Sequence, residues 1–160
     1  MGKKILLADD EEDIKIVLRM FLESRGYEVC TAYDGLDAID QARNEKPDVI
    51  LLDIMMPLLD GFEVCRQLKA DPETKDTPII MLSAASHAES VQKGLNAGAI
   101  DYLIKPFALQ EVEVRLNALA RRGKGVLFTV IGAQLREQAL GCFGRLFIGY
   151  GIYQLKDFGF

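Results

Sequence analysis

The chain has 160 residues, 49% of them hydrophobic and 27% charged, with a formal net charge of −5 at pH 7. A chain of this length can bury a sizeable core as one domain with an appendage, and its acidic balance argues against direct nucleic-acid binding by this fragment. No apolar run approaches the roughly 20 residues of a membrane span, and three widely spaced cysteines indicate a reducing compartment, so we expect a soluble cytoplasmic protein.

Short apolar runs alternate five times with segments of helical periodicity before residue 122. Apolar runs of this length indicate strands buried on both faces, and glycines such as Gly26 indicate helix ends. We expect strands over 4–8, 27–31, 49–53, 78–82 and 100–104, and helices over 12–25, 36–44, 61–69, 90–97 and 109–120. Connections of these lengths suit right-handed crossovers. The sequence therefore predicts an α/β fold, a five-stranded parallel sheet with helices on both faces.

One carboxylate, Asp53, ends the third expected strand inside the apolar run VILLDI. A charge buried there is costly unless a cation or hydrogen bonds meet it, and open α/β sheets bind ligands at the carboxyl ends of their strands. Asp9 and Asp10 follow the first strand, Ser83 the fourth and Lys105 the fifth. Singly, these residues could serve as helix caps, turn residues or a breaker. Together they suit Mg²⁺ and a phosphoryl group, with a carboxylate as the nucleophile.

The segments LLADDEED, LLDIMMPLLDGFE, IIMLSAA and DYLIKPF resemble the receiver domain of two-component response regulators, over about residues 3–121. The resemblance implies a doubly wound, flavodoxin-like fold with strand order 2-1-3-4-5 along the chain. It implies that Asp53 accepts a phosphoryl group from a phosphohistidine on a sensor histidine kinase or phosphotransfer protein. Mg²⁺ would be bound by Asp10, Asp53 and the backbone carbonyl of Met55, with Asp9 acting mainly through water.

The resemblance also implies a phosphorylation-controlled switch. Lys105 would pair with the phosphoryl oxygens, and Ser83 would hydrogen-bond to them. Tyr102 matches the aromatic residue whose rotamer reports the state, and Pro106 would follow Lys105 through a cis peptide bond. The readout would be the face formed by the fourth helix, fifth strand and fifth helix, directed to an output domain or a downstream protein. Formation of a homodimer on phosphorylation is a further option.

Two positions beside the expected acceptor bear on how long phosphorylation lasts. Met55 lies two residues after Asp53, and Ala85 lies two residues after Ser83. In the family, these positions help admit or orient the water that hydrolyses the acyl phosphate. Neither side chain can hydrogen-bond a water here, so we predict slow self-dephosphorylation. The chain would then be no conventional enzyme, although it catalyses its own phosphoryl transfer and slow dephosphorylation at Asp53.

Two other functions could use the same residue types. A phosphohydrolase with Asp53 as nucleophile typically carries a second aspartate two residues later, where this chain has Met55. A purely structural scaffold of receiver type would be expected to lack one of the acidic, hydroxyl or lysine positions, and all are present. The single histidine, His87, lies in the polar segment SAASHAES and is interpreted as a solvated loop residue.

The composition changes after Arg122. Residues 123–160 hold eight of the fourteen glycines and seven of the thirteen aromatic residues, but only six charged residues. We therefore separate a receiver domain, 1–122, from an unassigned tail, 123–160. In the tail we expect a strand over 125–132, a helix from Ala133 to about Phe147, and then a strand-like or disordered end. The tail is interpreted as a truncated output domain, a non-native extension or, less favoured, a segment that docks on the receiver or a second subunit.

Overall fold

The structure is a computed structural model of the whole chain, and it describes residues 3–84, 88–122, 145–148 and 151–154. The chain divides into two units, Met1–Gly125 and Val126–Phe160. The domain boundary expected after residue 122 stays a prediction, because residues 123–144 lie outside the described ranges. Among the helices in those ranges, none has both the length and the apolar character that crossing a membrane requires.

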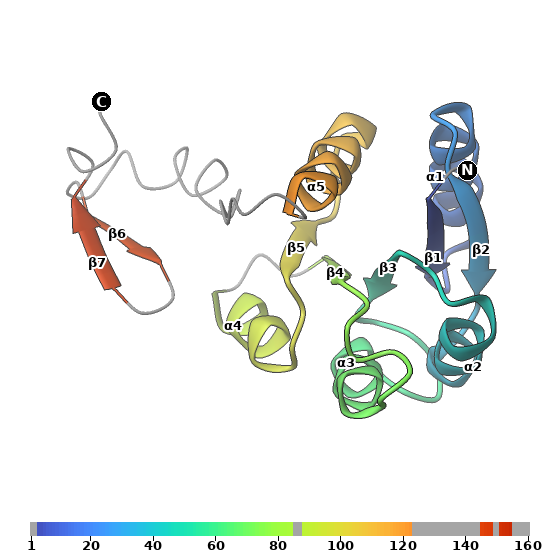
Figure 1. Cartoon of the computed structure of the whole chain (residues 1–160), viewed down its shortest axis with the longest axis horizontal. Helices are drawn as coiled ribbons and strands as arrows, with labels where there is room; N and C mark the ends of the chain where they lie inside the picture. The colour runs from blue at the N-terminus through green and yellow to red at the C-terminus, as the bar shows by residue number, and fades with distance from the viewer. Residues whose placement is uncertain (1–2, 85–87, 123–144, 149–150, 155–160) are drawn as a thin grey trace. The chain divides into compact units, whose positions relative to one another are not determined.

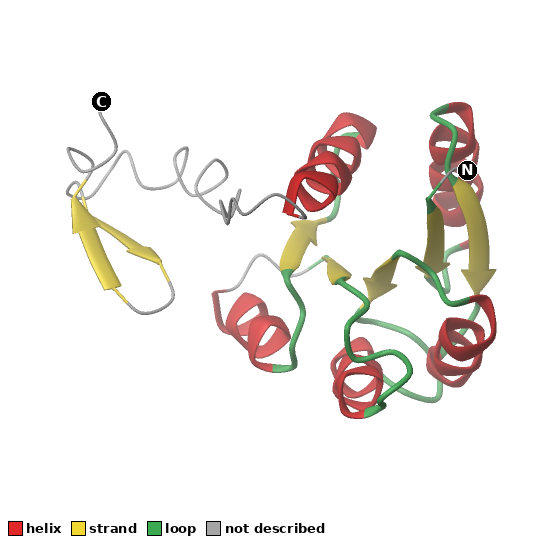
Figure 2. Ribbon diagram, in the orientation of Figure 1, coloured by secondary structure: helices red, strands yellow, loops and turns green. Residues whose placement is uncertain are grey.

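The first unit is built on a five-stranded parallel sheet, shown in Figures 1 and 2. Its strands are β1 (Lys4–Ala8), β2 (Glu28–Ala32), β3 (Val49–Asp53), β4 (Ile79–Ser83) and β5 (Asp101–Ile104). They lie in the order β2-β1-β3-β4-β5, and every neighbouring pair is parallel. The expected α/β fold and strand order are confirmed. The order reverses at β1, so the crevice at the carboxyl ends of β1 and β3 is the place where such sheets bind ligands.

Five helices cover the two faces of this sheet. They are α1 (Glu12–Ser24), α2 (Gly35–Glu45), α3 (Gly61–Ala70), α4 (Ala88–Asn96) and α5 (Leu109–Arg122). α1 and α5 lie on one face, and α2, α3 and α4 lie on the other (Figure 1).

Each sheet face has its own hydrophobic core. Ile5 of β1 lies in the core with α1 and α5, whereas the next residue, Leu6, lies in the core with α2 and α3. β3 alternates in the same way, since Ile50 and Leu51 belong to opposite cores. Successive side chains of a strand point to opposite faces, so both must be apolar when both faces are covered. This explains the unbroken apolar runs in the sequence.

The observed elements differ from the expected ranges by one or two residues at most ends. β2 begins at Glu28 rather than Tyr27, because the end of α1 takes up the residues just before it. Gly26 has φ +84° and donates its N–H to Glu23, while the N–H of Tyr27 reaches back to Leu22 at 3.1 Å. This pattern closes the last turn of a helix through a left-handed residue, a conformation that glycine adopts without strain.

In the second unit, the described residues form an antiparallel hairpin of β6 (Arg145–Ile148) and β7 (Gly151–Gln154). The expected helix from Ala133 to about Phe147 is wrong for residues 145–147, which belong to β6, and its earlier part lies outside the described residues. The expected strand over 125–132 also lies outside them. The strand-like alternative for the end of the chain is confirmed for 147–148 and 151–154. RLFI and GIYQ are rich in β-branched and aromatic residues, which favour a pleated strand.

Candidate phosphoryl-acceptor site

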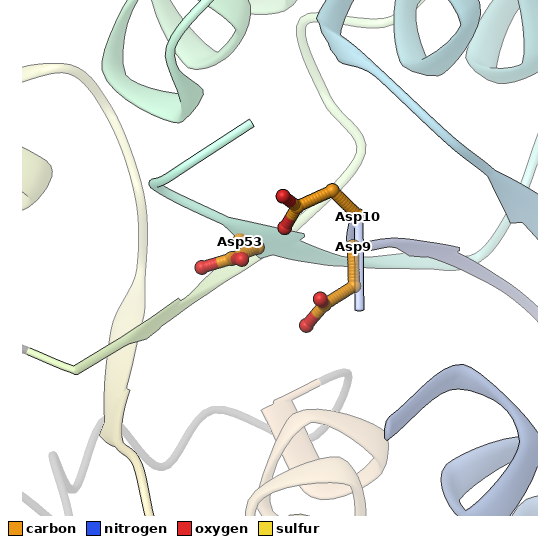
Figure 3. Close-up of side chains that lie close together, drawn as sticks. All are labelled: Asp9, Asp10 and Asp53. Carbon is orange, nitrogen blue, oxygen red and sulfur yellow. The ribbon is translucent and has the colours of Figure 1, made fainter. Parts of the chain in front are cut away.

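Three carboxylates gather at the carboxyl ends of two adjacent strands, as Figure 3 shows. Asp9 and Asp10 follow β1, and Asp53 is the last residue of β3. Each offers a carboxylate oxygen, and these oxygens all lie within 4.8 Å of one another. Asp9 and Asp53 are buried, whereas Asp10 is exposed. The cluster predicted from strand ends is therefore present, because the parallel pairing of β1 with β3 brings both ends to one edge.

The backbone around the cluster holds the buried carboxylates in place. The N–H of Glu11 donates to Asp9 Oδ1 at 2.8 Å, and the N–H of Met55 lies 3.4 Å from Asp53 Oδ1. After β3 the chain turns back so closely that a Cβ at Gly61 would overlap the carbonyl oxygen of Asp53. Only glycine fits this close approach, which seats the first turn of α3 directly against the end of β3.

Lys105 supplies the positive charge of the site from the end of β5. Its Nζ lies 2.8 Å from Asp9 Oδ2, 2.9 Å from Glu11 Oε1 and 3.3 Å from Asp53 Oδ2. Its backbone N–H donates to the carbonyl of Ser83 at 2.6 Å, and the bond to Pro106 is cis, as expected. Sequence reasoning had assigned no role to Glu11. The available signal was the acidic run DDEED, which places a third carboxylate immediately after the pair that follows β1.

The negative charges of Asp9 and Asp53 repel each other, and the positive charge of Lys105 compensates them only in part. Burial, together with the charge of Asp9, raises the pKa of Asp53 to about 6, and Lys105 only partly offsets this rise. Burial alone would lower the pKa of Lys105, but its hydrogen bonds to Asp9 and Glu11 outweigh that effect and raise it. One ammonium group therefore does not neutralise the cluster. Several carboxylate oxygens with an excess of negative charge are the donor set that a hard divalent cation prefers, so these residues fit such an ion.

Ser83 and Tyr102 form a second group beside the carboxylates. Ser83 ends β4 and is 2% exposed, and Tyr102 lies in β5 and is 5% exposed. Burial raises the pKa of the Tyr102 phenol, a hydrogen bond with Ser83 partly offsets the rise, and the charge of Asp53 adds to it. The Tyr102 ring lies inward beside Gly94 of α4, where an added Cβ would sit 3.5 Å from the ring. The hydroxyl of Ser83, the phenol of Tyr102 and the carboxylate of Asp53 thus influence one another.

Two residues singled out from the sequence, Ala85 and His87, lie outside the described ranges. Met55 is described, and its side chain is 72% exposed beside Asp53.

Comparison with known proteins agrees with this geometry. The model of the response regulator receiver domain family matches residues 5–117. The response regulator MprA of Mycobacterium bovis is 46% identical over 124 residues, covering 78% of this chain and 53% of the relative. The alkaline phosphatase synthesis transcriptional regulatory protein PhoP of Bacillus subtilis is 48% identical over 124 residues, covering 78% and 51%. The chain thus spans about half the length of these curated relatives.

Solved structures give the same result. The receiver domain of the Francisella response regulator 1452 is 36% identical with a TM-score of 0.71, covering 77% of this chain and 100% of that one. The receiver domain of the sensor histidine kinase PA1611 from Pseudomonas aeruginosa, which holds a magnesium ion in its active-site cleft, is 34% identical with a TM-score of 0.69, covering 74% and 98%. The chain therefore belongs to the response regulator receiver domain family, whose members are signalling domains rather than conventional enzymes.

Proposed function

We propose that this chain is a phosphorylation-controlled switch in which Asp53 accepts a phosphoryl group from a phosphohistidine of a sensor histidine kinase or phosphotransfer protein. The observation that carries this proposal is the position of Lys105, whose Nζ contacts the carboxylates of Asp9, Glu11 and Asp53 and lies 3.3 Å from Asp53 Oδ2. An acceptor carboxylate needs a cation beside it to receive the phosphoryl oxygens, and the lysine supplies one.

The transfer follows from the state of Asp53. A pKa of about 6 leaves most of this carboxylate ionised at neutral pH, and hence nucleophilic. One of its oxygens attacks phosphorus as the bond from phosphorus to the histidine nitrogen breaks. The electron pair of the broken bond stays on that nitrogen, and the imidazole leaves neutral because its other ring nitrogen carries a proton. The product is an acyl phosphate on Asp53, with Lys105 placed to contact its oxygens.

Asp10, Asp53 and the backbone carbonyl of Met55 would hold Mg²⁺, with Asp9 acting mainly through water. When bound, this ion supplies positive charge that offsets the carboxylates and the incoming phosphoryl oxygens. The magnesium ion in the related PA1611 receiver domain supports this assignment by analogy.

The signal would pass from Asp53 through Ser83 and Tyr102. Phosphorylation adds about −1.5 to −2 units of charge and three acceptor oxygens. The Ser83 hydroxyl interacts with Tyr102, whose ring is already buried. A bond from Ser83 to the phosphoryl group would weaken that interaction and let the Tyr102 ring pack further into the space that Ser83 leaves. Tyr102 lies in β5, so the face formed by α4, β5 and α5 would change. That face would engage an output domain, a downstream protein or a second copy of the chain.

Acetyl phosphate tests the acceptor directly. The wild-type chain, incubated with acetyl phosphate and Mg²⁺, is expected to gain one phosphoryl group by mass spectrometry of the intact protein. Asp53→Asn should gain none, whereas Asp40→Asn, which changes an exposed carboxylate of α2, should behave as wild type. If Asp53→Asn gained phosphate at the wild-type rate, Asp53 would not be the acceptor. Once Asp53 is established as the acceptor, a phosphotransfer profile against candidate sensor kinases would identify the partner kinase.

A further inference from the structure

Glu11 shares Lys105 with the two buried carboxylates of the site. The three hydrogens of the lysine ammonium group are directed at three different carboxylates, with Nζ 2.8 Å from Asp9, 2.9 Å from Glu11 and 3.3 Å from Asp53. The contact with the proposed acceptor is the longest of the three. Lys105 is therefore held closer to Asp9 and Glu11 than to the carboxylate that it is meant to serve.

The side chain of Glu11 is committed to this contact. Glu11 stands at the N-cap position of α1, yet its side chain makes no capping bond to its own helix. Its backbone N–H is fixed by the hydrogen bond to Asp9 Oδ1, so the residue is anchored to the carboxylate cluster at both ends. A glutamate at the start of a helix usually interacts with the helix N-terminus, and this one reaches across to β5 instead.

A phosphoryl group on Asp53 requires Lys105 to redirect one of its three hydrogens. Asp9 is completely buried, so breaking its contact with Lys105 would leave Asp9 Oδ2 away from water without its charged partner, which is costly. The Glu11 side chain is 59% exposed, so water can replace the lysine there at little cost. Glu11 is thus the partner that gives way when Lys105 moves.

We propose that Glu11 is a positioning residue that holds Lys105 in a resting place and so limits how readily the lysine engages a phosphoryl group. This inference rests on the proposed function and names a control built into the same site. Neutralising Glu11 should free Lys105 to move toward Asp53. Phosphoryl groups and their mimics should then bind more tightly, and phosphorylation should be faster.

The test compares two neighbouring substitutions of the same chemical type. Glu11→Gln and Glu12→Gln each remove one exposed negative charge, but Glu12 pairs with Lys15 rather than Lys105. The affinity for beryllofluoride, a phosphoryl mimic, and the rate of phosphorylation by acetyl phosphate are measured with saturating Mg²⁺. Both are repeated in about 1 M salt, where long-range charge effects are screened. Glu11→Gln should exceed Glu12→Gln by about two- to fivefold in both measurements, the size expected of a partly exposed ion pair.

A double-mutant cycle with Lys105→Met separates positioning of the lysine from simple repulsion of the anion. If Glu11 acts through Lys105, Glu11→Gln should have no effect on beryllofluoride affinity in the Lys105→Met background. An enhancement that persisted there, or equal effects of Glu11→Gln and Glu12→Gln in the wild-type background, would overturn the inference while leaving Asp53 as the acceptor. If Lys105→Met folds poorly, equal effects of Glu11→Gln and Glu12→Gln in the wild-type background would still overturn the inference. A wild-type chain that took up neither phosphate nor beryllofluoride would overturn the proposed function and this inference together.

Discussion

At Asp53, two unfavourable effects act in the same direction. The side chain is 2% exposed and faces the charge of Asp9, and together these raise its pKa to about 6 from an ordinary value of 3.8. The ionised carboxylate is therefore less stable in the folded chain than in the unfolded one. This unfavourable free energy is reduced by any change that adds positive charge beside Asp53 or removes the negative charge of its carboxylate.

The neutral substitution Asp53→Asn is therefore expected to stabilise the metal-free fold. Between about pH 4 and pH 6 the unfolded chain has lost the Asp53 proton while the folded chain still holds it, so the wild type loses stability as the pH rises through this window. Above about pH 6, the free energy of unfolding of Asp53→Asn should exceed that of the wild type by about 2–3 kcal/mol. This difference should vanish as the pH falls to about 4. Urea unfolding in the presence of a chelator measures this difference.

Asp40→Asn is the control for this measurement, because Asp40 is exposed on α2. Its effect should be small at every pH. An Asp53→Asn variant no more stable than wild type at neutral pH would show that Lys105 already compensates the buried charge fully.

Met55 is a second residue whose surroundings lead to a prediction. Its side chain is 72% exposed, lies beside the proposed acceptor Asp53 and offers no hydrogen bond to a water. Met55→Asn, which can orient a water, should shorten the lifetime of the acyl phosphate, whereas Met55→Leu should leave it unchanged. The decay of phosphorylated protein after removal of the donor gives both lifetimes. A wild-type lifetime of seconds would contradict slow self-dephosphorylation.

At the scale of elements, a buried ion pair joins β5 and α5. Arg115 of α5 is 4% exposed, and its Nη1 lies 2.7 Å from each carboxylate oxygen of Asp101, the first residue of β5. This pair ties the helix to the strand that carries Tyr102 and leads to Lys105. The orientation of α5 in the proposed output face is thus coupled to the strand of the site.

Arg115→Met keeps the apolar stem but removes the charge. We expect a loss of about 3 kcal/mol in the free energy of unfolding, because Asp101 would remain largely buried without its partner. Arg19→Met breaks an exposed pair with Glu23 on α1 and should cost less than about 1 kcal/mol. Chemical denaturation of both variants provides the comparison. Equal costs would mean that the Asp101 carboxylate is readily solvated.

The elements themselves were well predicted because their signals are local. Strands buried on both faces need unbroken apolar runs, and all five strands were located to within one residue. The errors fell at the ends, where a cap decides the last residue. α2 begins at Gly35 rather than Leu36, since the Asp34 side chain caps it by accepting the N–H of Asp37 at 2.9 Å.

At the scale of the whole molecule, the described core and the candidate site both come from the first unit, Met1–Gly125. Among the described residues, both hydrophobic cores draw only on positions between 5 and 119. The carboxylates, Lys105, Ser83 and Tyr102 come from the same unit. The proposed switch therefore requires no residue after Arg122.

A chain ending at Arg122 should consequently fold and bind beryllofluoride with the affinity of the full chain. Its free energy of unfolding should differ from that of the full chain by less than about 0.5 kcal/mol, the usual range for changes outside the core. Thermal unfolding and the beryllofluoride titration would measure this. A truncated chain that failed to fold would favour the interpretation in which the tail docks on the receiver.

The sequence by itself determined the α/β class and placed Asp53 together with Asp9, Asp10, Ser83 and Lys105 at one edge of the sheet. It could place these residues because each lies at the end of an apolar run, and parallel strands bring such ends to one edge of the sheet. It did not reveal the ion pair between Glu11 and Lys105 or the buried position of Tyr102 beside Ser83. Glu11 and Lys105 are 94 residues apart, and only the pairing of β1 with β3, β3 with β4 and β4 with β5 sets the distance between them. That distance is a property of the assembled sheet, which no local pattern encodes.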